Sequence, residues 1–277
     1  MKSIFLKLSM LTFVLLFANN VNSQDFQGQA IYFSKSKMDL GTWGARLSEA
    51  QKKQIQAQMK NRLEKTYVLT FNKEESLFNE EDKLDAISGA TDSWGNNFSA
   101  GEQYKNVKQN ALIQSQEFYG KKFLVKDELQ PIEWKMGTES KQIGKYMCFK
   151  ATALVPTAEL NWFSFSWNDI RANSNSYPAD STKVASTEDV KMTAIEAWYS
   201  PQIPVRHGPA EYWGLPGLIL EVSVGDTTML CSEIIMNPKE KIKIEAPDKG
   251  KLITKSEYKS TISGKMLEMR NNRGRRN

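Results

Sequence analysis

Side chains that commonly carry catalysis or bind metals are scarce in this sequence of 277 residues, which has one histidine and two cysteines. A single histidine excludes the His-Glu-x-x-His zinc protease motif, and two cysteines are too few for a four-cysteine zinc site. The sequence also lacks the Gly-x-Ser-x-Gly elbow, the P-loop and the Gly-x-Gly-x-x-Gly motif. We therefore predict no catalytic residue and no cofactor, and we expect a protein that is not an enzyme.

The one histidine, His207, lies between Arg206 and the pair Gly208-Pro209. An imidazole in such a segment could act as a general base or a metal ligand, but a lone histidine is more often a structural or surface residue. An enzyme centred on His207 and an acidic partner is therefore one alternative hypothesis.

The two cysteines, Cys148 and Cys231, lie in apolar runs typical of strands. In an oxidising compartment such a pair commonly forms a disulfide, and closing so long a loop would stabilise the fold by up to about 4 kcal/mol. Two buried free thiols are the second interpretation. The third is a soft-metal site, in which nearby methionines such as Met147 and Met229 add thioethers that suit copper(I). A copper-handling protein that uses both cysteines, His207 and methionines is thus a further functional hypothesis.

Aromatic residues are concentrated in the second half of the chain and could line a hydrophobic hollow. Alternatively, they fill the core of a large sheet. On the first interpretation, the candidate ligand-binding residues are Trp162, Trp167, Trp198, Tyr199, His207 and Trp213.

The first 23 residues have the layout of a secretory signal peptide. Lys2 and Lys7 precede the apolar residues 8–18, and Ser23 precedes Gln24. This layout predicts cleavage near Ser23-Gln24 and export of the mature protein, which is then periplasmic or associated with the outer membrane. Beyond this leader, no stretch is apolar and long enough for a membrane-spanning helix, so we expect no transmembrane segment in the mature chain.

A capping box is indicated by Ser48 and Gln51, three residues apart. Leu47, Ile55, Met59 and Leu63 follow at multiples of four, which predicts a long amphipathic helix up to Leu63. We expect this helix to pack on a sheet.

Most of the remaining chain predicts antiparallel strands, because short apolar runs alternate with Gly, Pro, Asn and Asp. Gly225-Asp226, between two such runs, predicts a tight hairpin. The two long polar stretches, residues 79–101 and 173–189, predict loops. The predicted strands cover residues 30–33, 67–71, 111–113, 118–119, 123–125, 144–154, 162–167, 193–199, 218–224, 228–236 and 242–244.

The net charge of +5 belongs largely to the end of the chain, where residues 265–277 carry five basic side chains against Glu268. We predict that this tail is disordered, with possible contact to the envelope. Because the rest of the mature chain is nearly neutral, we expect no nucleic-acid partner.

A specific motif lies at residues 214–219. Prolines interrupt residues 201–209, and Gly214, Leu215, Pro216 and Gly217 then lead into the apolar run that starts at Leu218 and Ile219. Since proline restricts φ and glycine reaches conformations closed to other residues, this motif predicts a rigid turn into a buried strand.

The chain resembles the GLPGLI family of exported bacterial proteins through this hexapeptide. The segments Trp198-Tyr199, Ile203-Pro204, Gly208-Pro209, residues 144–151 and Asn237-Pro238-Lys239 also resemble the family pattern. The resemblance implies export and supplies no reaction, since the function of that family is uncharacterised.

These observations predict an α+β, mainly antiparallel fold: a curved sheet or half-open barrel packed against one long helix. The expected organisation is a signal peptide at 1–23, a single domain at 24–264 and a basic tail at 265–277. The leading hypothesis is a non-enzymatic periplasmic or envelope-associated binding protein for an apolar ligand, a lipid or a peptide.

Overall fold

The computed structural model describes residues 26–37, 44–81, 98–160, 162 and 191–274. Its centre is one 12-stranded sheet with the strand order β12-β6-β5-β4-β3-β2-β1-β11-β10-β9-β8-β7. Neighbouring strands are antiparallel, except that β12 runs parallel to β6. The elements are β1 (Gln27–Ser36), α3 (Glu49–Leu63), β2 (Glu64–Asn72), β3 (Glu75–Glu80), β4 (Phe98–Asn106), β5 (Ala111–Phe118), β6 (Lys121–Glu128), β7 (Lys135–Ile143), β8 (Tyr146–Pro156), α4 (Thr157–Leu160), β9 (Met192–Ser200), β10 (Leu218–Val224), β11 (Thr227–Met236), β12 (Lys251–Ile253) and α6 (Lys255–Gly274).

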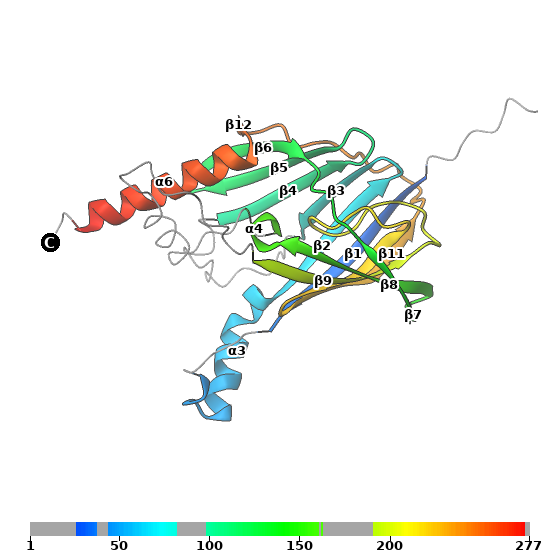
Figure 1. The fold of residues 1–277 in the computed structure, drawn as a ribbon, viewed down its shortest axis with the longest axis horizontal. Helices are drawn as coiled ribbons and strands as arrows, with labels where there is room; N and C mark the ends of the chain where they lie inside the picture. The colour runs from blue at the N-terminus through cyan, green and yellow to red at the C-terminus, as the bar shows by residue number, and fades with distance from the viewer. Residues whose placement is uncertain (1–25, 38–43, 82–97, 161, 163–190, 275–277) are drawn as a thin grey trace, which may run out of the picture.

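The sheet is curved and open, with β7 and β12 as its two edges (Figure 1). The predicted fold class, α+β with a curved antiparallel sheet, is confirmed. Period-2 alternation builds the inner face: every second residue of β5 is buried, beginning with Leu112. The buried hydrophobic residues form three clusters, of which the largest includes residues of β1, β2, β3, β8, β9, β10 and β11.

The hairpin predicted at Gly225-Asp226 is confirmed, since these two residues join β10 to β11. Gly225 has a φ of +54°, in the left-handed region that glycine adopts without steric cost. The predicted strand over residues 218–224 coincides with β10. The hairpin therefore sets the register in which the buried residues of β10 face the interior.

The helix that covers the sheet is α6, which the sequence analysis missed. Thr254 and Glu257 form its capping box: the Glu257 N–H donates to Thr254 Oγ1 (3.2 Å), and the Thr254 N–H donates to Glu257 Oε2 (2.9 Å). Tyr258, Ile262 and Met266 follow at intervals of four and are buried in a cluster with residues of β5 and β6.

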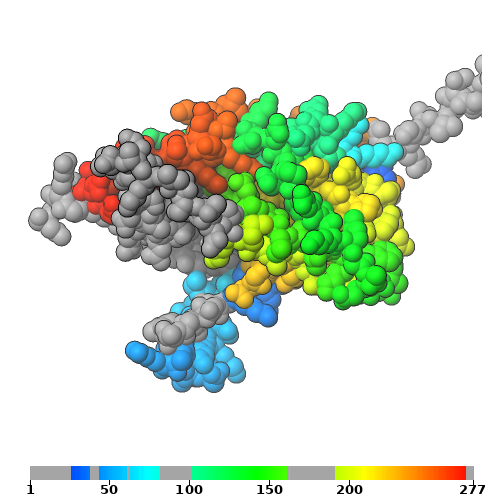
Figure 2. All heavy atoms as spheres, in the orientation of Figure 1, coloured from blue at the N-terminus to red at the C-terminus, as the bar shows by residue number. Residues whose placement is uncertain are grey.

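The prediction that the first long helix packs on the sheet was wrong. The capping box of Ser48 and Gln51 is present in α3, but α3 projects away from the body of the molecule (Figures 1 and 2). Ile55 and Met59 remain only half-buried. The spacing of apolar residues identified a helix without identifying the surface that it contacts.

Other predictions need correction at particular segments. Residues 265–274, expected to be a disordered tail, form the second half of α6. Residues 242–244 are not a strand, whereas β3, β4, β7 and β12 were not predicted. Apart from residue 162, the predicted strand at 162–167 and the predicted loop at 173–189 lie outside the described residues. The predicted loop at 79–101 includes the end of β3 and the start of β4. Within the described part of the chain, no helix is long and apolar enough to span a bilayer.

The different environments of the two helices lead to a stability prediction. Replacing Ile262→Ala in α6 should lower the free energy of unfolding by about 2–4 kcal/mol, because it leaves a cavity in a buried cluster. The matched change Ile55→Ala in α3 should cost less than about 1 kcal/mol. Urea unfolding measures both values, and equal losses would contradict the packing of α6.

A buried polar network at Glu211

Residues 201–217 connect β9 to β10 and fold back onto the start of β10. The backbone N–H groups of Leu218 and Ile219 donate to the carbonyls of Ile203 (3.0 Å) and His207 (3.1 Å). A side chain on Gly217 would meet the Ser200 carbonyl oxygen at 2.3 Å, and Gly214 has a φ of +99°. The predicted role of this motif agrees with this geometry, because the two glycines hold the connection close against the strands.

Lys105 of β4 fixes the middle of this connection from the opposite side of the interior. Its fully buried ammonium group donates to the backbone carbonyls of Gly208 (2.7 Å), Ala210 (2.5 Å) and Tyr212 (3.3 Å). Burial lowers the pKa of Lys105 to about 7, and the carboxylate of Glu211 opposes this shift. One side chain of the sheet thus satisfies three carbonyls of a buried turn.

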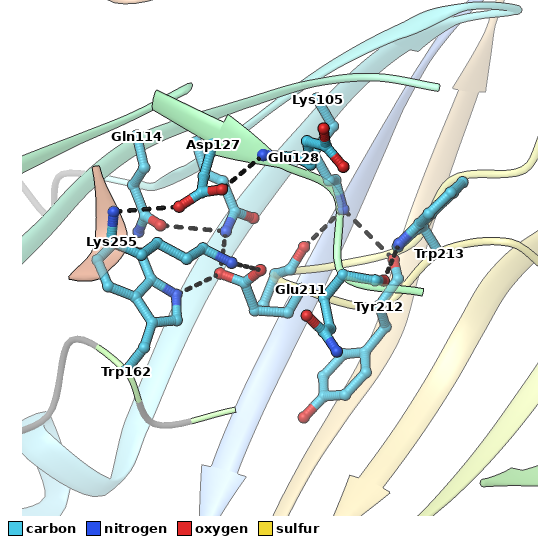
Figure 3. A network of polar contacts seen from close by, with 12 residues as sticks. Lys105, Gln114, Asp127, Glu128, Trp162, Glu211, Tyr212, Trp213 and Lys255 are labelled. Carbon is cyan, nitrogen blue, oxygen red and sulfur yellow. Dashed lines mark hydrogen bonds and ion pairs between the residues drawn. The ribbon is translucent and has the colours of Figure 1, made fainter. Parts of the chain in front are cut away.

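The turn held by Lys105 places Glu211 in the interior. Ala210 has a φ of +46°, a conformation that is uncommon for a residue with a side chain. Glu211 Oε1 accepts hydrogen bonds from Gln103 Nε2 (2.6 Å) and Trp162 Nε1 (3.1 Å). Gln103 Nε2 also donates to Gln114 Oε1 (3.2 Å), so the network extends from β4 to β5 (Figure 3).

The first turn of α6 joins the same network (Figure 3). Lys255 Nζ lies 3.9 Å from Glu211 Oε2 and over the ring of Trp162, 5.4 Å from its centroid. The Lys255 backbone N–H donates to Asp127 Oδ2 of β6 (3.1 Å). Glu211 therefore links the 201–217 connection, the inner face of the sheet and the helix that covers it.

This arrangement holds several elements of the fold together. Glu211 accepts from two donors and lies beside Lys255, so its carboxylate is held in a fixed orientation. Two neighbouring polar atoms, Ser76 Oγ and Gln103 Oε1, are buried without a hydrogen-bond partner in the described structure. Such unpaired atoms are exceptions to the usual pairing of buried polar groups.

His207 is completely buried, next to Phe71 at 6.5 Å between ring centroids. Burial and the charge of Lys105 lower its pKa to about 3, and the Asn72 carbonyl opposes this only in part. Neither ring nitrogen makes a hydrogen bond to a described residue. The geometry gives no support to a catalytic pair of His207 and an acidic residue in this part of the chain.

Cys148 and Cys231 are free thiols in the structure, so the predicted disulfide is not formed there. Their strands, β8 and β11, are separated in the sheet by β9 and β10. Burial raises the pKa of Cys148 to about 11 and that of Cys231 to about 12. Both thiols therefore favour the protonated form, which is a poor metal ligand. Among the described residues, no group of three His, Cys, Asp or Glu side chains could hold a metal ion.

The aromatic residues predicted to line one hollow lie in different environments. Trp162 packs against Tyr258 of α6, and Tyr199 belongs to a separate buried cluster. Trp198 lies under Lys141, whose Nζ is 4.2 Å from the ring centroid. Trp213 donates from Nε1 to the Gln130 carbonyl (2.8 Å). Trp167 lies outside the described residues.

These contacts show a filled interior at the described positions, which is the alternative that the sequence analysis left open. Adjacent residues of a strand point to opposite faces, so Trp198 and Tyr199 could not both line one hollow. The prediction of one shared aromatic cavity is thus corrected for the described residues.

Sequence reasoning missed the residues that build the network. Lys105 and Gln103 alternate in β4, a strand with too few apolar residues to be recognised. No sequence pattern near Glu211 indicates its role, because its partners come from β4, residue 162 and α6. Lys255 was detectable in principle, since it follows the capping residue Thr254.

Comparison with known proteins gives a family match for part of the chain. Residues 134–221 match the model of a family described as "Protein of unknown function (Porph_ging)". This segment contains Glu211 and the hexapeptide at residues 214–219. The comparison supports similarity to that family and does not confirm the GLPGLI name.

The chain is also similar to two crystal structures entitled "Structure of PNGF-II", in the C2 and P21 space groups. Both have 14% sequence identity to it and a TM-score of 0.48, and the alignments cover 86% and 85% of this chain. This chain spans about a third (32%) of the length of each PNGF-II chain. No curated protein matches the sequence.

The Lys105 contacts predict a large stability effect. Replacing Lys105→Met should lower the free energy of unfolding by about 3–5 kcal/mol, because it leaves three buried carbonyls without their charged donor. Lys108→Met is the matched control: Lys108 is exposed and pairs with Glu74, so its loss should cost less than about 1 kcal/mol. Similar effects in urea unfolding would contradict the proposed role of Lys105.

Buried His207 predicts a specific sensitivity to acid. Its pKa of about 3 in the folded state is below the ordinary value of 6.5, so below pH 6.5 the unfolded chain binds a proton that the folded protein does not. Stability present above pH 6.5 should therefore be lost as the pH falls towards 3, with a loss of about 2 kcal/mol at pH 5.

The variant His207→Leu isolates this contribution, because leucine does not titrate. Urea unfolding of both proteins at pH 7.5 and pH 5 should show a loss that is about 2 kcal/mol smaller for the variant. An identical loss in both proteins would mean that His207 is not held neutral.

Proposed function

We propose that this protein is a non-enzymatic binding protein, exported and associated with the cell envelope. Its ligand is an apolar molecule that carries a polar group, such as a lipid or a peptide. The binding surface is the inner face of the open sheet beneath the 201–217 connection and α6.

The observation that carries this proposal is the pair of buried, unpartnered atoms Ser76 Oγ and Gln103 Oε1. Ser76 pairs with Lys105 in the register of β3 and β4, and Gln103 pairs with Phe78, so the two lie on neighbouring rows of one face. An unpaired buried polar group costs about 1–3 kcal/mol, which a polar group of a ligand would offset. Apolar residues of β1, β2 and β3 next to these rows suit the rest of such a ligand.

Access to this face depends on α6 in our proposal. The helix is the last described element and covers β5 and β6 at one end of the sheet (Figure 1). Its polar link to the interior is the 3.9 Å contact of Lys255 with Glu211, together with the hydrogen bond to Asp127. Movement of α6 would expose Trp162 and the polar rows behind it.

Envelope association in this proposal combines the leader sequence with the end of α6. Lys265 and Arg270 lie in the second half of the helix, and Arg270 is exposed. Basic side chains near an anionic lipid surface each contribute about 1 kcal/mol to binding.

Native mass spectrometry of protein purified from its own envelope tests the proposal directly. We expect a bound species of added mass, and uptake of a fluorescent long-chain fatty acid by the emptied protein. Recovery with nothing bound, together with no uptake of the fatty acid, would overturn the proposal.

A conservative variant tests the position of the site. Ser76→Ala removes an unpartnered hydroxyl, so it should leave stability nearly unchanged and weaken fatty-acid binding by about fivefold. Ser232→Ala is the control, because Ser232 is exposed and donates to the Ile31 carbonyl. Equal binding by Ser76→Ala and the unmodified protein would place the ligand elsewhere.

A further inference from the structure

A separate pocket of about 290 Å³ lies where β4, β5 and β6 meet the segment that leads to β12. Its lining comes from three strands and from this segment: Gly101, Glu102, Ser115, Gln116, Glu117, Lys122, Pro247, Asp248 and Lys249. None of these residues belongs to the network around Glu211.

A β-bulge shapes one wall of the pocket. The register of β4 and β5 shifts between Ala100 and Gln103, so Gly101 and Glu102 together oppose the single residue Ser115. A side chain on Gly101 would lie 2.1 Å from Ser115 Oγ. Only glycine allows the two strands to approach so closely at this point.

A second glycine fixes the opposite wall. Gly250 has a φ of +138°, and a side chain there would meet the backbone of Phe123 and Leu124 at 2.8 and 3.0 Å. The segment 247–249 is therefore held close beside β6 as it enters β12. Both walls are built from backbone that is fixed by local geometry.

The charged groups of this lining make no ion pair within the described structure. Glu117 and Lys122 are directly opposite in the register of β5 and β6, yet neither takes part in an ion pair within the described structure. The same holds for the other three charged lining residues, Glu102, Asp248 and Lys249.

We propose that this pocket binds a small zwitterion with the chemistry of an amino acid or a short peptide. Two lysines donate to a carboxylate, and three carboxylates accept from an ammonium group. A multiply charged phosphate ester would be repelled by the three carboxylates, and an apolar ligand would desolvate five charges without compensation. The volume is at the lower end of the range for small-molecule sites, which limits the ligand to a small molecule.

Isothermal titration calorimetry of the whole protein with the dipeptide alanyl-alanine tests this inference. We expect binding of the dipeptide, and none of its uncharged analogue N-acetyl-alanyl-alanine amide or of glucose. Absence of binding, or equal binding of either neutral probe, would overturn it.

Two variants test the location of the site. Lys122→Gln should weaken binding by about two- to fivefold, as expected for an exposed ion pair. Lys126→Gln, a change on the same face of β6 outside the pocket, should have no effect. If Lys122→Gln binds the dipeptide like the unmodified protein, the assignment is wrong.

Discussion

The buried ammonium group of Lys105 forms the interaction on which the interior depends. A buried charge is costly unless it is fully hydrogen-bonded, and here three backbone carbonyls of one turn supply the acceptors. The turn in return gains a donor for carbonyls that neither helix nor sheet satisfies. Because this contact holds Ala210 in a left-handed conformation, the adjacent Glu211 points inwards, where Gln103, Trp162 and Lys255 reach it.

The inner face of the sheet is consequently divided into apolar and polar parts. Residues of β1 to β3 pack with the 201–217 connection in an apolar cluster, and those of β6 pack with α6 in another. Between them, β4 and β5 carry Gln103, Lys105 and Gln114. This division explains why a search for aromatic residues alone did not find the network around Glu211.

Much of the architecture could be predicted where the signal was local. The strand that begins at Leu218 and the hairpin at Gly225 depend on apolar runs and on glycine conformations, which act within a few residues. The capping box at Ser48 likewise identified the start of α3. Packing partners were not predictable in this way. Both α3 and α6 have capping boxes and apolar residues at intervals of four, yet only α6 lies on the sheet.

The sequence by itself determined the secondary structure of many segments, the antiparallel class and the rigid entry into β10, since these follow from side-chain periodicity and local backbone sterics. Only the tertiary structure decided which helix covers the sheet, that Cys148 and Cys231 are buried free thiols, and that Glu211 meets Lys255. Those outcomes depend on the 12-stranded sheet, which brings distant parts of the chain together, as for Lys105 and Gly208, 103 positions apart. No local sequence pattern encodes these contacts, because the position of each strand depends on the twist accumulated over all the strands between the two residues.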